Sequence, residues 1–111
     1  MSADAVAAQV AARLAQLWQT SRPSILERLA VLQASGVTLQ QDAQDGEARN
    51  RGREAAHKLS GVLGVFGLPR GSEIAAEIEH VLKAGEPLTP ADLALIQSRI
   101  AELEAVIASK S

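Results

Sequence analysis

The stretch AAHKLSGVLGVFG, residues 55–67, decides how the rest of this sequence is interpreted. Its apolar residues recur at helical spacing, which predicts a helix with one buried side. Glycine nevertheless stands at positions 61 and 64, where it costs about 1 kcal/mol relative to alanine inside a helix. His57 lies within two turns of both glycines. The two glycines therefore need a physical explanation, and the neighbouring residues supply one.

The helix that carries His57 is expected over about residues 47–66. Gly67 supplies its C-cap, and Pro69 follows directly, as is typical after a helix end. Upstream, the polar loop QQDAQDGEARN separates this helix from the preceding one. The buried side is expected to consist of Ala55, Ala56, Leu59, Val62, Leu63 and Phe66.

Two more helices are expected toward the C-terminus, over about residues 69–84 and 90–109. In the turn between them, Thr89 is an N-cap and Pro90 suits the first helical position, while Asp92 lies at the positive end of the helix dipole. Both segments have apolar residues at helical spacing. These residues are Ile74, Ala75, Ile78, Val81 and Leu82 in the first, and Leu93, Ile96, Ile100, Leu103 and Ile107 in the second.

The N-terminal third is expected to form two helices, the first over about residues 3–20. Pro23 suits the first turn of a new helix, while Ser24 and Glu27 offer a capping box one residue later, so the second start is open. Gly36 either lies inside this second helix or ends it. The apolar stripe of the first helix is Val6, Val10, Leu14, Leu17 and Trp18; that of the second is Ile25, Leu29, Leu32 and Leu39.

These elements predict an all-α fold. Short connections make successive helices antiparallel neighbours, so the sequence predicts an antiparallel up-down four-helix bundle over about residues 22–109, with an additional N-terminal helix. Hydrophobic residues make up 47% of the 111 residues, and only Trp18 and Phe66 are aromatic, which favours helices over strands. A chain of this length is expected to form a single domain, residues 1–111.

Composition excludes several classes of function. Without cysteine the chain has neither disulfides nor thiolate zinc sites, and it suits a reducing compartment, so a cytoplasmic location is expected. No apolar run is long enough to span a bilayer, and the first residues lack a basic leader, so neither membrane insertion nor secretion is expected. The net charge of −2 argues against a general nucleic-acid binder.

The two glycines lie on the same side of their helix as the histidine. At about 100° per residue, Gly61 and Gly64 fall within a narrow arc around His57, Ser60 flanks that arc, and Arg53 precedes it by one turn. His57 is therefore expected to face solvent beside a bare strip that a partner's backbone can approach. The alternatives are an ordinary surface histidine and glycines that allow close helix packing. Because the glycines lie away from the apolar side, access is the better explanation.

The segment AHKLSGVLGVFG, followed by SEIAAEIE, resembles the histidine phosphotransfer (HPt) domain of two-component phosphorelays. Members place a phosphoacceptor histidine in mid-helix, glycines four and ten residues later, and a helix with an acidic end next. His57, Gly61, Gly67 and residues 75–79 match this pattern. The resemblance implies that His57 exchanges a phosphoryl group with a receiver domain of a response regulator or hybrid histidine kinase.

One position departs from the commonest form of that family. Many members have lysine three residues after the histidine, where this chain has Ser60. Our hypothesis is that Ser60 hydrogen-bonds a phosphoryl oxygen while Lys58 or Arg53 supplies positive charge. Solvated surface cations are an equally good interpretation of Lys58 and Arg53.

The chemistry implied is nucleophilic. An exposed imidazole has a free ring nitrogen at pH 7 and can attack phosphorus. The sequence has neither a Walker-type glycine loop nor a carboxylate cluster for Mg²⁺ beside His57. We therefore expect no cofactor and no kinase activity on this chain, with Mg²⁺ carried by the partner.

Two rival functions remain. Glu54 with His57, and Glu77 with His80, form Glu-x-x-His segments like those of di-iron bundles, but both pairs lie off the apolar stripes. A metal centre is therefore disfavoured. A helical module that docks a partner without carrying phosphate is the other alternative, because the usual lysine is missing.

Overall fold

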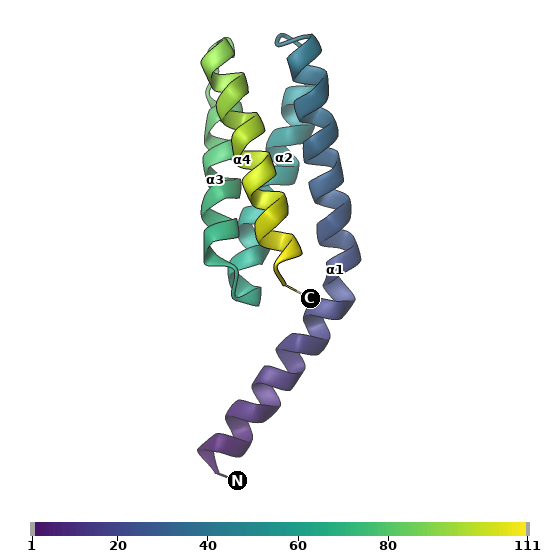
Figure 1. Ribbon diagram of the computed structural model, residues 1–111, viewed down its shortest axis with the longest axis vertical. Helices are drawn as coiled ribbons and strands as arrows, with labels where there is room; N and C mark the ends of the chain where they lie inside the picture. The colour runs from purple at the N-terminus through teal and green to yellow at the C-terminus, as the bar shows by residue number, and fades with distance from the viewer. Residues whose placement is uncertain (1, 111) are drawn as a thin grey trace.

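Four α-helices and one 3-10 turn make up the secondary structure of residues 2–110, the part of the chain that the computed structural model describes. Each helix packs against the next, and α4 closes the bundle against α1 (Figure 1). The predicted all-α, antiparallel up-down bundle is confirmed. The elements are α1 (Ala3–Gln41), α2 (Gly46–Leu63), η1 (Gly64–Phe66), α3 (Pro69–Lys83) and α4 (Pro90–Ala108).

The expected break between two N-terminal helices is wrong. Helix α1 runs without interruption through Pro23, and through Gly36 as well. Trp18 and Ile25 are seven residues apart, two turns along one face, and both are almost fully buried. Packing on both sides of Pro23 thus holds the helix together although proline removes one backbone hydrogen bond. Figure 1 shows α1 changing direction between its purple and blue parts, as expected near a proline.

The N-terminal part of α1 extends past the other helices, so the molecule measures 57 × 20 × 19 Å (Figure 1). Trp18 is its first buried residue and contacts the ring of Phe66 edge-on, with 5.4 Å between the ring centroids. The predicted additional helix is thus a continuation of the first bundle helix. Within residues 2–110, no helix has both the length and the apolar character needed to cross a membrane. The apolar side chains of the projecting part are exposed: Val6, Val10, Leu14 and Leu17.

Helix α2 lies between α1 and α3 and approaches both closely. Its buried side includes Ala48, Ala55 and Ala56, together with Gly52. A Cβ atom at Gly52 would lie 3.1 Å from the Cβ of Ser35 on α1 and within 3.2 Å of a Leu82 methyl on α3. Small side chains therefore allow the close approach, which fixes the position of α2 relative to both neighbours.

The ends of the helices follow the predicted signals. Gly67 has a φ of 74°, the left-handed conformation that favours glycine, and ends the turn after α2. Pro69 starts α3 directly afterwards. Thr89 and Asp92 form the reciprocal capping box of α4, and the hydrogen bond from the Thr89 backbone lowers the pKa of the Asp92 carboxyl. Short, well-capped connections thus set the order of the helices.

Leucine introduced at two glycines of α2 should have different effects on the free energy of unfolding. Gly52→Leu must force apart α1 and α3 and should lower the free energy of unfolding by about 1–3 kcal/mol. At Gly61 an added Cβ meets no atom within 4 Å, so Gly61→Leu should leave stability unchanged or raise it by up to about 1 kcal/mol. Urea unfolding followed by the fluorescence of Trp18, the chain's one tryptophan, measures both. Equal midpoints for the two variants would contradict this account of α2.

Candidate functional site: an exposed histidine paired with a carboxylate

His57 lies midway along α2 on the side that faces solvent. Its side chain is 69% exposed. The ring is held from the α3 side by Glu79, whose carboxylate oxygens lie 2.7 and 3.1 Å from Nδ1 of His57. Glu79 itself is mostly covered, with 19% of its side chain exposed. The outward orientation expected from the helical spacing is therefore present, with one added restraint from α3.

The Glu79 carboxylate determines which ring nitrogen of His57 carries a proton. An ionised carboxylate only accepts hydrogen bonds, so Nδ1 must donate and carry the hydrogen. In the neutral ring the lone pair is then on Nε2, and no described residue hydrogen-bonds to that atom. Nε2 is the nitrogen available for attack on an electrophile.

The two glycines after His57 differ in their surroundings. At Gly61 a side chain would meet open space, so nothing in residues 2–110 requires glycine there. At Gly64 an added Cβ would lie 3.3 Å from Oγ of Ser72, and the Gly64 N–H donates to the same oxygen at 2.9 Å. Gly64 is thus explained in part by the approach of α3, whereas Gly61 leaves an uncovered strip beside the imidazole.

Two serines connect the end of α2 to the start of α3. The Ser60 hydroxyl donates to the carbonyl of His57, one turn back, at 2.7 Å. The Ser72 hydroxyl donates to the carbonyl of Ser60 at 2.6 Å. Because Ser72 also accepts from Gly64, it fixes the last turn of α2 against α3. Ser60 keeps acceptor capacity but points along its own helix in this conformation.

None of the cations near His57 contacts its ring. Arg53 donates to the side chain of Asn50 at 2.9 Å, and Lys58 pairs with Glu54 at 3.6 Å. Arg49 has a structural role that the sequence pattern did not indicate. Its guanidinium donates to the carbonyls of Leu82, at 2.8 Å, and Ala84, and so satisfies the C-terminal end of α3.

The Glu-x-x-His segments considered for metal binding lie on the outside of the bundle. His57 and His80 are exposed, and so are Glu54 and Glu77. Residues 2–110 contain no cluster of three or more histidine, cysteine, aspartate or glutamate side chains arranged around one point. Within residues 2–110, Glu79 is the carboxylate that contacts the His57 ring, and it is engaged with Nδ1. This donor set does not fit a Mg²⁺ site on the chain itself.

Comparison with known proteins identifies the family. Residues 13–106 match the Hpt domain, so this chain belongs to the Hpt domain family. The match begins within the projecting part of α1 and includes His57 and all of α2, α3 and η1. The helical bundle of this chain is thus an Hpt domain.

One curated relative is Protein RcaC of Microchaete diplosiphon. It is 29% identical over 96 residues, which cover 86% of this chain. The chain spans 15% of the length of RcaC. No solved structure was found to match the chain.

The His57–Glu79 contact predicts the tautomer of the histidine. At about pH 8.5, where an imidazole is neutral, ¹⁵N spectra should show His57 as the Nδ1–H form. Glu79→Ala should remove this preference, whereas Glu79→Gln, whose amide oxygen can still accept, should retain part of it. His80, the chain's other histidine, provides a reference in the same spectra. A dominant Nε2–H form of His57 in the wild-type protein would rule out the orientation described here.

Proposed function

We propose that this Hpt domain carries a phosphoryl group on Nε2 of His57 and exchanges it with an aspartate of a receiver domain. The observation that carries the proposal is the exposed ring whose Nδ1 is held by Glu79, which leaves Nε2 unhindered. Membership in the Hpt family supports it independently of the geometry. The partner is a receiver domain of a response regulator or of a hybrid histidine kinase.

In the proposed reaction, the Nε2 lone pair attacks the phosphorus of an aspartyl phosphate on the partner. The N–P bond forms while the P–O bond breaks, and the aspartate leaves as a carboxylate. The product ring bears a phosphoryl group on Nε2 and a proton on Nδ1, so it is cationic. The Glu79 carboxylate, 2.7 Å from Nδ1, compensates that charge. Transfer to a second receiver domain reverses these steps.

Other groups of the reaction are assigned to the partner. Because the donor set around His57 does not fit Mg²⁺, we expect the metal ion to be bound by the receiver domain. Gly61 leaves room for the partner's backbone beside the imidazole. Ser60 can turn toward a phosphoryl oxygen, while Lys58 and Arg53 contribute positive charge nearby. The chain is a phosphocarrier in this proposal and needs neither an ATP site nor kinase activity of its own.

Transfer from a phosphorylated receiver domain tests this function. Wild-type chain mixed with receiver domains of its own organism, each phosphorylated in the presence of Mg²⁺, should acquire label that is labile in acid and stable in base. His57→Gln should abolish the label, and His80→Gln, which changes the other exposed histidine, should not. With ATP and Mg²⁺ alone we expect no label.

The same assay measures the contribution of Glu79. Loss of a hydrogen bond to a charged group corresponds to about 1.5–3 kcal/mol, so Glu79→Ala should slow transfer about ten- to hundredfold. The transfer rate of Glu79→Gln should lie between those of the wild-type chain and Glu79→Ala. Absence of label in wild-type chain with every receiver domain tried would leave only the alternative function, a helical module that docks a partner without carrying phosphate.

A further inference from the structure

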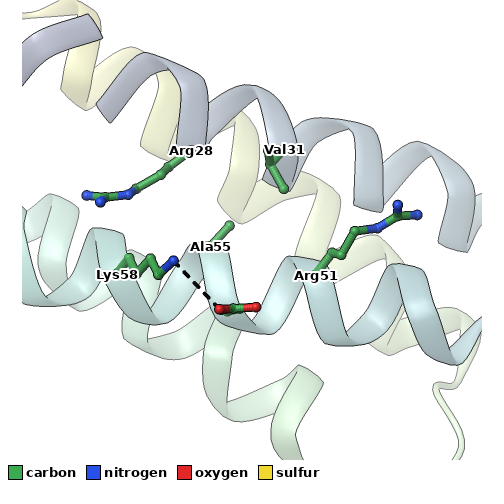
Figure 2. A pocket seen from close by; sticks show the side chains of 6 residues that line it. Arg28, Val31, Arg51, Ala55 and Lys58 are labelled. Carbon is green, nitrogen blue, oxygen red and sulfur yellow. Dashed lines mark ion pairs between the residues drawn. The ribbon is translucent and has the colours of Figure 1, made fainter. Parts of the chain in front are cut away.

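A groove opens between α1 and α2 on one side of His57. It lies toward α1, whereas Glu79 reaches the ring from α3. On α2, Lys58 and Arg51 line it and are turned by about 100° and 120° from His57 around the helix axis. A second, adjoining hollow continues it along α1. We refer to the first of these hollows as the α1–α2 groove. Its lining residues are Arg28, Val31, Arg51, Glu54, Ala55 and Lys58 (Figure 2).

The α1–α2 groove combines an apolar centre with positively charged ends, and it also contains the Glu54 carboxylate, which pairs with Lys58 (Figure 2). Figure 2 shows Val31 of α1 and Ala55 of α2 in the middle, with Arg28 and Lys58 toward one end and Arg51 toward the other. Val31 is 40% exposed although it is a large aliphatic residue. Arg51 and Lys58 are seven residues apart, which separates them by about 10 Å, or two helical turns.

The cations of the groove are available to a partner. Arg28 makes no hydrogen bond or ion pair with any residue between 2 and 110. Arg51 and Lys58 pair with Glu47 and Glu54 on their own helix, but at 3.7 and 3.6 Å and with more than half of every side chain exposed. Exposed pairs of this kind are weak and screened by salt, so a carboxylate from a partner can replace them.

On the opposite side of the bundle, two arginines are engaged by carboxylates. Arg99 of α4 donates to Glu77 of α3 at 2.6 Å, and Arg70 donates to Glu102 at 2.9 Å. The carboxylates raise the pKa of Arg70, chiefly through the hydrogen bond to Glu102. Glu79 adds a further negative group beside His57 from the same side. The α3 side thus places a carboxylate directly against the ring, and an exposed cation, Lys83, lies one turn of α3 beyond Glu79. The α1–α2 groove instead brings three cations together without a carboxylate against the ring.

We infer that the α1–α2 groove docks an acidic amphipathic segment of the receiver domain and so directs the partner toward His57. The inference rests on the proposed function. A helix with an aliphatic side chain over Val31 and carboxylates two turns apart matches both the apolar centre and the spacing of Arg51 and Lys58. Complementary charge of this kind accelerates encounter and fixes the register of two surfaces.

Charge reversal tests the groove. Arg28→Glu is the central variant because Arg28 makes no hydrogen bond or ion pair with any residue between 2 and 110, and Arg51→Glu tests the other end. Arg13→Glu is the matched control, since it makes the same change of charge on the exposed, projecting part of α1. Single-turnover transfer is measured against the concentration of a phosphorylated receiver domain that labels the wild-type chain, at ionic strengths of about 50–500 mM.

We expect Arg28→Glu and Arg51→Glu to raise the half-saturating receiver concentration tenfold or more, with the rate at saturation within about twofold of wild type and Arg13→Glu unchanged. Salt should weaken the wild-type interaction and affect Arg28→Glu much less. An effect no larger than that of Arg13→Glu, or one confined to the saturated rate, would overturn the inference while the phosphotransfer function stands.

Two further outcomes would also overturn it. If light scattering shows a dimer of the wild-type chain that Arg28→Glu dissociates, a second copy covers the groove in place of the receiver domain. If no receiver domain labels the wild-type chain, the proposed function fails, and the assignment of the groove fails with it.

Discussion

The close approach of α2 to both α1 and α3 is the constraint on which the rest of the structure depends. Alanine and glycine on the buried side of α2 bring it near both neighbours, and Gly52 leaves no room for a side chain between Ser35 and Leu82. With α2 fixed in this way, its outer face is flanked on both sides. One neighbour supplies Glu79 to the His57 ring, and the other supplies Arg28 and Val31 to the α1–α2 groove.

The helices on the two sides of His57, α3 and α1, affect its surroundings in different ways. The α3 flank acts on the imidazole itself, because the contact from Glu79 decides which nitrogen carries a lone pair. The α1 flank has no contact with the ring and presents instead an apolar surface between cations. In the proposed function, reactivity and recognition thus depend on separate helices, so a change in the choice of partner need not alter the proposed nucleophile.

Much of this could be predicted from local sequence. The end of η1 at Gly67, the N-cap of α4 at Thr89 and the outward direction of His57 each depend on residues a few positions apart. What the sequence did not reveal depends on contacts across helices. Glu79 reaches His57 only through the register of α2 against α3. Arg49 caps the C-terminal end of α3, which lies 34 residues later in the sequence. The continuity of α1 also depends on packing, since burial of Trp18 and Ile25 outweighs the local stop signal at Pro23.

The contact between His57 and Glu79 also makes the tautomer of the proposed nucleophile a tertiary property. The two residues are 22 positions apart and belong to different helices. A peptide comprising residues 55–67 would hold the acceptor and every glycine of the motif, yet its imidazole would exchange freely between tautomers. Local opening of the α2–α3 pair would release the ring from Glu79 even while α2 stayed helical, so the proposed reactivity of His57 would fall with the loss of the intact bundle.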